Sequence, residues 1–167
     1  MNKIILIIIV IAVVAVGVFI MQNKDSVQPI LNTVKDNTIV VSGNNKLDLS
    51  GQGLTSIPSY VFGKTNLSEL NVSHNNLTGA IQAEIRHLGN LKILNASYNQ
   101  MTGVPAEVGQ LQKLEILDLS YNQLTGLPNE LGNLKNLKTL NLAGNSYSQQ
   151  DLDQIRAKLP NTNFILK

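Results

Sequence analysis

One stretch decides the fold of this chain, and it reads Leu114-Glu-Ile-Leu-Asp-Leu-Ser-Tyr-Asn-Gln-Leu-Thr-Gly-Leu-Pro-Asn-Glu-Leu-Gly-Asn-Leu-Lys-Asn136. The same skeleton starts again at three other leucines and, more faintly, at an asparagine: Leu67, Leu91, Leu137 and Asn44. Successive starts lie 23, 24, 23 and 23 residues apart. A period of this size indicates a solenoid, in which each unit buries its apolar face against its neighbours.

Four positions of the unit keep their residue type. The fourth is always leucine: Leu47, Leu70, Leu94, Leu117 and Leu140. The sixth is aliphatic: Leu49, Val72, Ala96, Leu119 and Leu142. The ninth is an amide, and the eleventh is large and apolar or aromatic: Gln52, Asn75, Asn99, Asn122 and Asn145; Leu54, Leu77, Met101, Leu124 and Tyr147. This pattern, L-x-x-L-x-L-x-x-N-x-L, resembles the leucine-rich repeat family over roughly residues 44–161.

The resemblance implies the α/β class: a short right-handed solenoid of five repeats with a parallel sheet on its concave side. The residues agree with this. Apolar residues at the fourth and sixth positions flank a polar fifth, which predicts a short strand with one buried face. The amide at the ninth position can satisfy backbone groups that the following turn leaves unpaired. Stacked amides should therefore form a ladder, from which Gln52 departs because it lies in a terminal repeat.

The second half of each unit is predicted to be a short helix or 3₁₀ turn on the convex side. Its apolar residues recur at i, i+4 and i+7, which is one helical face. Pro105 and Pro128 are expected in the first helical turn, where a missing N–H costs nothing. Gly109 and Gly132 are expected to limit the helix to a turn or two.

The repeats are predicted to occupy residues 44–147, with residues 148–167 as a C-terminal cap. Ser148 and Asp151 have the spacing of a capping box, with Asp in place of the usual Glu. The helix that follows should end at Pro160, and Phe164–Leu166 should form a last short strand. Ahead of the repeats, residues 22–43 read as a juxtamembrane linker and an N-terminal cap that includes a strand at Thr38–Ser42.

Residues 1–21 are predicted to be a single transmembrane helix, which would anchor the chain as a single-pass membrane protein. Ile4–Met21 is 18 residues long, without proline or charge, and would span roughly 27 Å as a helix. The alternative is a signal peptide cleaved near Ala15-Val-Gly17. The apolar run continues beyond that site, which favours an uncleaved signal-anchor. Because such segments usually serve export, the repeat domain is expected to be extracytoplasmic.

Composition excludes several classes of function. The chain has no cysteine, so it has no disulfides and no zinc–thiolate site. It has 13 basic and 11 acidic residues, interspersed along the sequence, so no basic stripe and no nucleic-acid partner is expected. His74 and His87 fall on different faces. Asp48 and Asp118 lie three repeats apart, about 14 Å, which is too far for a glycosidase pair. The sequence thus predicts no enzyme, no cofactor and no metal site.

What remains is the concave face. Its seventh position is expected to point outward and holds small residues: Ser50, Ser73, Ser97, Ser120 and Ala143. The third, fifth and eighth positions supply the predicted partner-binding residues: Glu69, Asn71, His74, Ile93, Asn95, Tyr98, Ile116, Asp118, Tyr121, Thr139 and Asn141. Isoleucines and tyrosines among small polar residues form a small amphipathic patch of the kind that interfaces favour. The alternative is that Asp-Leu-Ser-Tyr-Asn is a family consensus with no ligand.

The sequence therefore predicts a non-enzymatic protein-protein interaction or scaffolding module, displayed at a membrane, that binds a protein or peptide through its concave face. Two alternatives stay open. One is a structural, envelope-associated protein without a dedicated ligand, and the other is a binding module secreted after signal cleavage. A binder should lose its partner on concave substitution, whereas a structural element should tolerate it.

Overall fold

The computed structural model describes residues 45–167. The predicted anchor at 1–21, the linker at 22–43 and the strand at Thr38–Ser42 lie outside the described residues. Within 45–167, no helix has the length and apolar character that crossing a membrane requires.

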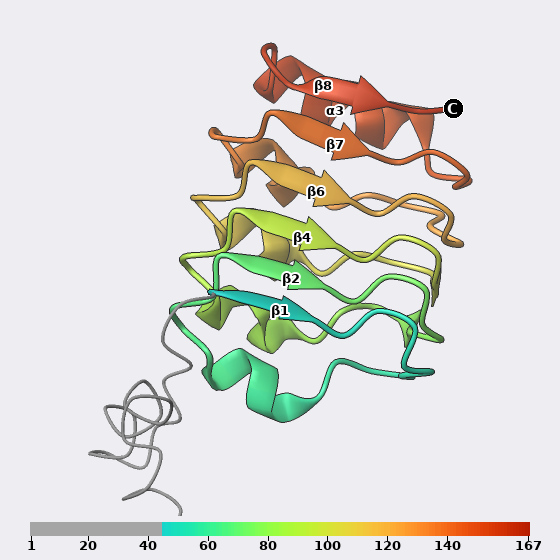
Figure 1. Ribbon diagram of the computed structural model, residues 1–167. Helices are drawn as coiled ribbons and strands as arrows, with labels where there is room; N and C mark the ends of the chain where they lie inside the picture. The colour runs from blue at the N-terminus through green and yellow to red at the C-terminus, as the bar shows by residue number, and fades with distance from the viewer. Residues whose placement is uncertain (1–44) are drawn as a thin grey trace, which may run out of the picture. The chain divides into compact units, whose positions relative to one another are not determined.

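Six short parallel strands form one sheet, ordered as they occur in the chain (Figure 1). Leu47 pairs with Leu70, Leu70 with Leu94 and Leu94 with Leu117, so equivalent positions stack without a slip. The in-register parallel sheet is therefore confirmed. The strands are β1 (Lys46–Asp48), β2 (Glu69–Asn71), β4 (Ile93–Asn95), β6 (Ile116–Asp118), β7 (Thr139–Asn141) and β8 (Asn163–Ile165).

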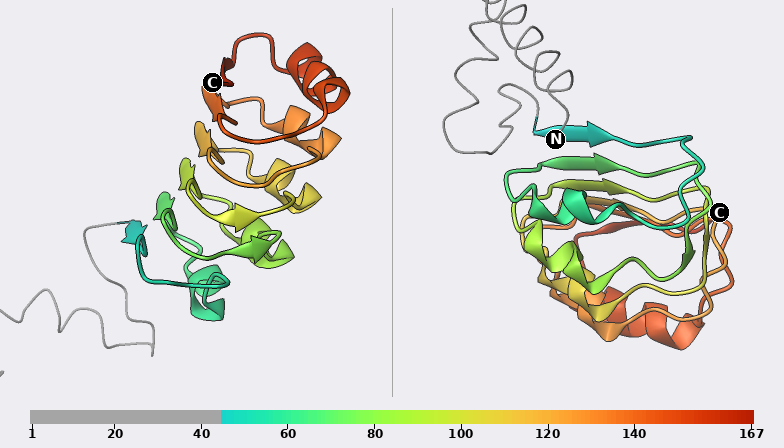
Figure 2. Two further views of the ribbon diagram at one scale, coloured as in Figure 1. Left: turned by 90° about the vertical axis from the view of Figure 1, so that its right-hand side faces the viewer. Right: turned by 90° about the horizontal axis from the view of Figure 1, so that it is seen from below.

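Opposite the sheet, each of the first four return paths contains a five-residue 3₁₀ helix (Figure 2). These are η1 (Ser59–Gly63), η2 (Ala83–His87), η3 (Ala106–Gln110) and η4 (Asn129–Asn133). Pro105 and Pro128 lie one residue before the helix, with extended ψ of 147° and 136°. They therefore precede the first turn rather than occupy it. Their fixed φ suits this position equally well.

The core lies between the strands and the 3₁₀ helices and runs through all repeats. Leucines at the fourth position, such as Leu94 and Leu117, are fully buried from the strand side. Ile85, Val108 and Leu131 are fully buried from the helix side. Because every unit contributes the same two rows, the core is continuous along the solenoid.

The asparagine ladder is present and links neighbouring repeats. Asn99 Oδ1 accepts a hydrogen bond of 3.0 Å from the Leu77 N–H of the preceding repeat. Its Nδ2 donates to the carbonyls of Val72 in the preceding repeat and Ala96 in its own. Gln52 is exposed and departs from the ladder, as expected. The other members are Asn75, Asn122 and Asn145.

Gly109 and Gly132 are the fourth of five residues in η3 and η4, so the predicted helix length of a turn or two is confirmed. The glycines are not what ends these helices, because η2 has the same length with Arg86 at the matching place. A Cβ at Gly109 would lie 2.2 Å from the Glu130 carbonyl oxygen of the next repeat. At Gly132 it would lie 2.4 Å from Lys158 Cδ. Glycine is needed at Gly109 because the backbone of the next repeat lies too close for a side chain, whereas at Gly132 the close neighbour is the flexible Lys158 side chain.

A second, two-stranded sheet pairs β3 (Thr78–Gly79) with β5 (Gln100–Met101) and was not predicted. Two residues are too few to show an alternating pattern, so periodicity gave no signal for it.

The C-terminal cap closes the sheet's last edge. Helix α3 (Gln149–Lys158) begins after Ser148, whose Oγ accepts from the Asp151 N–H at 3.4 Å. The Asp151 carboxylate accepts from the Leu127 N–H at 3.1 Å, so this side chain joins the cap to the last repeat. Strand β8 pairs with β7, as the sequence indicated.

Candidate functional site

We call the side formed by the strands the strand face. Three positions of each repeat reach it. The third position begins each strand and supplies Glu69, Ile93, Ile116 and Thr139. The fifth position ends each strand and supplies Asn71, Asn95, Asp118 and Asn141. The eighth position lies beyond the strand and supplies His74, Tyr98 and Tyr121. All eleven predicted partner-binding residues are at least partly exposed.

The seventh position is less exposed than expected for an outward position, being half-buried at Ser50 and buried in the later repeats. Ser73, Ser97 and Ser120 are only 3–5% exposed, and Ala143 is buried as well. The seventh side chain still lies on the strand face, because the Ser120 hydroxyl reaches the Asp118 carboxylate there. It is small and is covered by its neighbours, while the tyrosines at the eighth position remain about half exposed.

The buried serines bond to the fifth position. Ser120 Oγ donates to Asp118 Oδ1 at 2.6 Å, and the Ser120 N–H donates to the same oxygen at 2.9 Å. Asn95 receives the same two bonds from Ser97. One oxygen of each fifth-position side chain is thus committed to the fold. For this column the contacts favour a structural role.

Hydrogen bonding also affects the ionisation of Asp48, the fifth-position residue of the first repeat. Bonds from the Ser50 hydroxyl and N–H stabilise the charged carboxylate and lower the pKa of Asp48. Farther along the column, Asn141 Nδ2 donates to Asp118 Oδ2 at 3.1 Å. The Asn141 amide thus donates to the carboxylate of the preceding repeat.

Three aromatic rings stack at the eighth position across consecutive repeats. The His74 and Tyr98 ring centroids lie 4.4 Å apart at 8°, and those of Tyr98 and Tyr121 lie 4.4 Å apart at 15°. Tyr98 and Tyr121 remain 46% and 50% exposed. The stack therefore presents its ring edges and hydroxyl groups to solvent.

The stacked residues have a strained backbone. His74, Tyr98 and Tyr121 have φ of 53–54°, in the left-handed region that residues other than glycine rarely adopt, although Asn, Asp and His do so more often than the rest. Glycines hold the same position in the repeats on either side: Gly51 at φ +66° and Gly144 at φ +70°. Left-handed conformation costs about 1–2 kcal/mol per residue, and an aromatic pair returns about 0.5–1.5 kcal/mol. The fold thus accepts glycine here and gains little stability from the aromatic rings.

Burial against its neighbours raises the pKa of the Tyr98 hydroxyl, and the charges and hydrogen bonding of Tyr121 and the charge of Asp118 raise it further. At neutral pH the Tyr98 phenol is therefore uncharged. It can donate a hydrogen bond to a ligand.

The isoleucines lie at the other end of the strands. Ile116 is 37% exposed and Ile93 is half-buried. Ile116 and Tyr121 are five positions apart, at most about 16 Å of extended chain. Asp118 ends the strand that Ile116 begins. The single amphipathic patch stays a prediction.

Within residues 45–167, no group of three or more His, Asp or Glu side chains could hold a metal ion. His87 ends η2 on the helix side, whereas His74 lies on the strand face. Glu69 forms an ion pair of 2.6 Å with Lys46.

Comparison with known families agrees with the repeat geometry. The family model described as Leucine rich repeat matches residues 45–101 and 97–146, more than half of the chain. The chain belongs to the leucine-rich repeat family. No curated protein sequence matches this leucine-rich repeat protein.

Several solved structures resemble it. A leucine-rich repeat protein of Leptospira interrogans is 41% identical over 66% of this chain and 28% of that chain, with a TM-score of 0.62. The ectodomain of the receptor kinase SOBIR1 from Arabidopsis thaliana is 31% identical over 72% of this chain and 67% of that chain, with a TM-score of 0.59. The ectodomain of the plant membrane receptor kinase GASSHO1/SCHENGEN3 from Arabidopsis thaliana was solved in complex with CASPARIAN STRIP INTEGRITY FACTOR 2. It is 35% identical over 58% of this chain and 12% of that chain, with a TM-score of 0.53.

The present chain thus spans about a quarter of the Leptospira protein and an eighth of the GASSHO1 ectodomain.

The aromatic stack could not be predicted from the sequence. Tyrosines at the eighth position were visible, but their left-handed backbone was not. The signal available was the glycine at that position in the first and last repeats, Gly51 and Gly144.

Proposed function

We propose that this leucine-rich repeat protein is a non-enzymatic interaction module that binds a protein or peptide through its strand face. The observation that carries the proposal is the exposed, strained stack of His74, Tyr98 and Tyr121. Strained residues that the fold does not require are concentrated at functional sites. Tyrosines are also enriched at interfaces, where they supply a large rigid surface and a polar hydroxyl.

The size of the strand face predicts modest affinity for a single site. Six strands at about 4.8 Å cover roughly 29 Å. With about 12 Å of outward-facing strand, the exposed area of the sheet is on the order of 350 Å², whereas a standard interface needs about 800 Å² per partner. The loops beside the strands, or several copies engaged together, supply the remaining contact.

Two related structures support a protein or peptide ligand. The GASSHO1/SCHENGEN3 ectodomain was solved in complex with CASPARIAN STRIP INTEGRITY FACTOR 2, and another similar structure is that of PEPR1 with AtPEP1. Each of the two structures is 35% identical in sequence to this chain over the matched part. We extend only the class of ligand to this protein.

The proposal includes display at a membrane by the N-terminal segment, with the repeats on the extracytoplasmic side. The apolar run Ile4–Met21 supports it. Carbonate washing of membranes, followed by intact-mass measurement, tests this part. A protein retained in the membrane with its N-terminus intact agrees with the proposal, and a soluble species beginning near Val18 identifies a secreted module instead.

The test of binding uses glycine at the stacked positions. Tyr98→Ala with Tyr121→Ala would keep the backbone strain and lose two stacked pairs, or about 1–3 kcal/mol of stability. Tyr98→Gly with Tyr121→Gly loses the same pairs but relieves the strain. In the glycine double variant the lost stacking and the relieved strain nearly cancel, so the free energy of unfolding should change little. A loss of binding in this variant therefore cannot be attributed to unfolding.

The partner is first identified by crosslinking the intact protein in its native membrane, and its affinity is then measured for each variant. Tyr98→Gly with Tyr121→Gly should abolish capture with little change in the thermal melt. Tyr60→Ala is the control, since Tyr60 is 56% exposed on η1, away from the strand face. Equal capture by all three proteins would show that the partner does not bind the aromatic stack.

A further inference from the structure

One lateral edge of the solenoid is basic, although the sequence shows no basic run. This edge contains the connections from each 3₁₀ helix to the next strand: residues 64–68, 88–92, 111–115 and 134–138. They carry five lysines against one glutamate, a net charge of +4. Residues 45–167 have ten basic and nine acidic residues, or +1, so the rest of the described chain is net −3. Stacking of the repeats therefore brings lysines that are far apart in the sequence to one edge of the solenoid.

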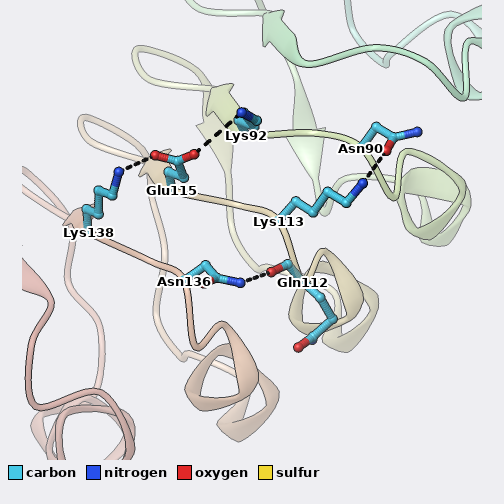
Figure 3. A network of polar contacts seen from close by, with 7 residues as sticks. All are labelled: Asn90, Lys92, Gln112, Lys113, Glu115, Asn136 and Lys138. Carbon is cyan, nitrogen blue, oxygen red and sulfur yellow. Dashed lines mark hydrogen bonds and ion pairs between the residues drawn. The ribbon is translucent and has the colours of Figure 1, made fainter.

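A network of polar contacts runs along this edge (Figure 3). Glu115 pairs with Lys138 at 2.5 Å and with Lys92 at only 3.9 Å. The closer lysine contributes most to lowering the pKa of the Glu115 carboxyl. Glu115 thus contacts Lys138 closely, whereas Lys92 lies at the limit of an ion pair. Glu115 makes no hydrogen bond with the Lys92 ammonium.

Lys113 lies beside Lys92 on the same edge. Its Nζ donates to Asn90 Oδ1 at 2.7 Å, and Asn90 Nδ2 donates to the Thr65 carbonyl at 2.9 Å. This partner is neutral, and no ion pair joins Lys113 to a carboxylate within the described residues. The amide therefore positions the ammonium group without neutralising it.

Both ammonium groups line a groove of about 360 Å³. The groove is lined only by polar residues: Asn45, Asn66, Ser68, Asn90, Lys92 and Lys113. Its volume is at the lower end of the range for ligand sites, which are usually apolar. A wholly polar lining with two cations and no carboxylate suits a ligand that is both anionic and rich in hydrogen-bonding groups.

We propose that this groove binds an acidic polysaccharide. The carboxylates of such a chain pair with Lys92 and Lys113, and its hydroxyl groups bond to the asparagine amides and the Ser68 hydroxyl, which both donate and accept. The lining has no aromatic side chain on which a nucleic-acid base could stack. The asparagine amides and the Ser68 hydroxyl beside the lysines fit a hydroxyl-rich chain better than a lipid surface, which attracts lysines by charge alone. The site is distinct from the strand face.

The experiment immobilises the full-length chain on a biosensor and measures binding of polygalacturonate, a polysaccharide with one carboxylate per sugar. Fully methyl-esterified polygalacturonate has the same backbone without charge. Vesicles of phosphatidylserine and phosphatidylcholine test a lipid source of negative charge. Binding of polygalacturonate alone, weakened by added salt, is expected.

The variant for this test is Lys92→Gln with Lys113→Gln, which leaves Asn90 and the groove's shape in place. Its affinity for polygalacturonate should fall at least about fivefold, because each exposed ion pair contributes a factor of a few. The control is Arg86→Gln with Lys167→Gln, which removes the same charge elsewhere and should bind as the unaltered chain does. A thermal melt shows that both double variants are folded.

Three outcomes would overturn the proposal. The first is no binding of polygalacturonate, and the second is equal weakening in both double variants, which means non-specific attraction. The third is binding of the vesicles, lost on removal of Lys92 and Lys113, in place of polygalacturonate, which assigns the edge to a membrane surface. None of these results bears on the aromatic stack, so the two proposals fail independently.

Discussion

Asn122 offers the sharpest test of the ladder, because its substitution orphans one identifiable group. Asn122 is 8% exposed, and its Oδ1 accepts from the Met101 N–H at 3.0 Å. Its Nδ2 donates to the carbonyls of Ala96, Leu119 and Ser120 at 3.0–3.2 Å. The side chain therefore joins the backbone of two repeats.

Asn122→Ala should lower the free energy of unfolding by about 1–3 kcal/mol, the usual cost of a buried unsatisfied donor. The Met101 N–H loses its acceptor. The carbonyls contribute less because each keeps a donor: Asn99 Nδ2 for Ala96, Asn145 Nδ2 for Leu119 and the Tyr98 N–H for Ser120.

Asn122→Asp is almost the same size but should be worse at neutral pH. One oxygen still accepts from Met101, while the other faces three carbonyl oxygens as an uncompensated buried charge, which costs about 3–5 kcal/mol. The surroundings should raise the pKa of this aspartate in the folded state. The variant is then most stable below its unfolded pKa of about 3.9 and loses stability as the pH rises through the folded pKa.

Urea unfolding followed by circular dichroism, at pH 3.5 and pH 7, measures these changes as shifts in the midpoint. Gln52→Ala is the matched control, because Gln52 holds the ladder position but is exposed; it should change stability by less than about 0.5 kcal/mol. The reasoning is refuted if Asn122→Ala matches the unaltered chain. It is also refuted if Asn122→Asp is as stable as Asn122→Ala at pH 7.

Two further substitutions test the packing between repeats. Gly109→Ala should lower the free energy of unfolding by more than about 3 kcal/mol, because the new Cβ meets the rigid backbone at Glu130. Gly132→Ala should lower it less, because its Cβ meets the flexible Lys158 side chain. Equal melting temperatures for the two variants would contradict this. Leu117→Ala should cost about 2–5 kcal/mol by leaving a cavity in the core, and an unmoved thermal transition would show that the strand register is wrong.

The sequence by itself determined the architecture, because the solenoid repeats a local pattern. Leucines at the fourth position set the register, as the pairing of Leu94 with Leu117 confirms. The asparagine ladder and the cap helix after Ser148 were also predictable. Each of these features depends on residues within one unit or its neighbour, so a period of 23–24 residues was enough to place them.

Only the tertiary structure decided the surface and the closest contacts. Tyr98 and Tyr121 adopt a left-handed backbone and their rings stack, and no spacing along the sequence signals such a backbone. Likewise, Lys92 and Lys113 are 21 residues apart in the chain but line one groove. These features arise where neighbouring repeats stack. Stacking brings together side chains that are far apart in the sequence, so the sequence alone does not show which of them meet.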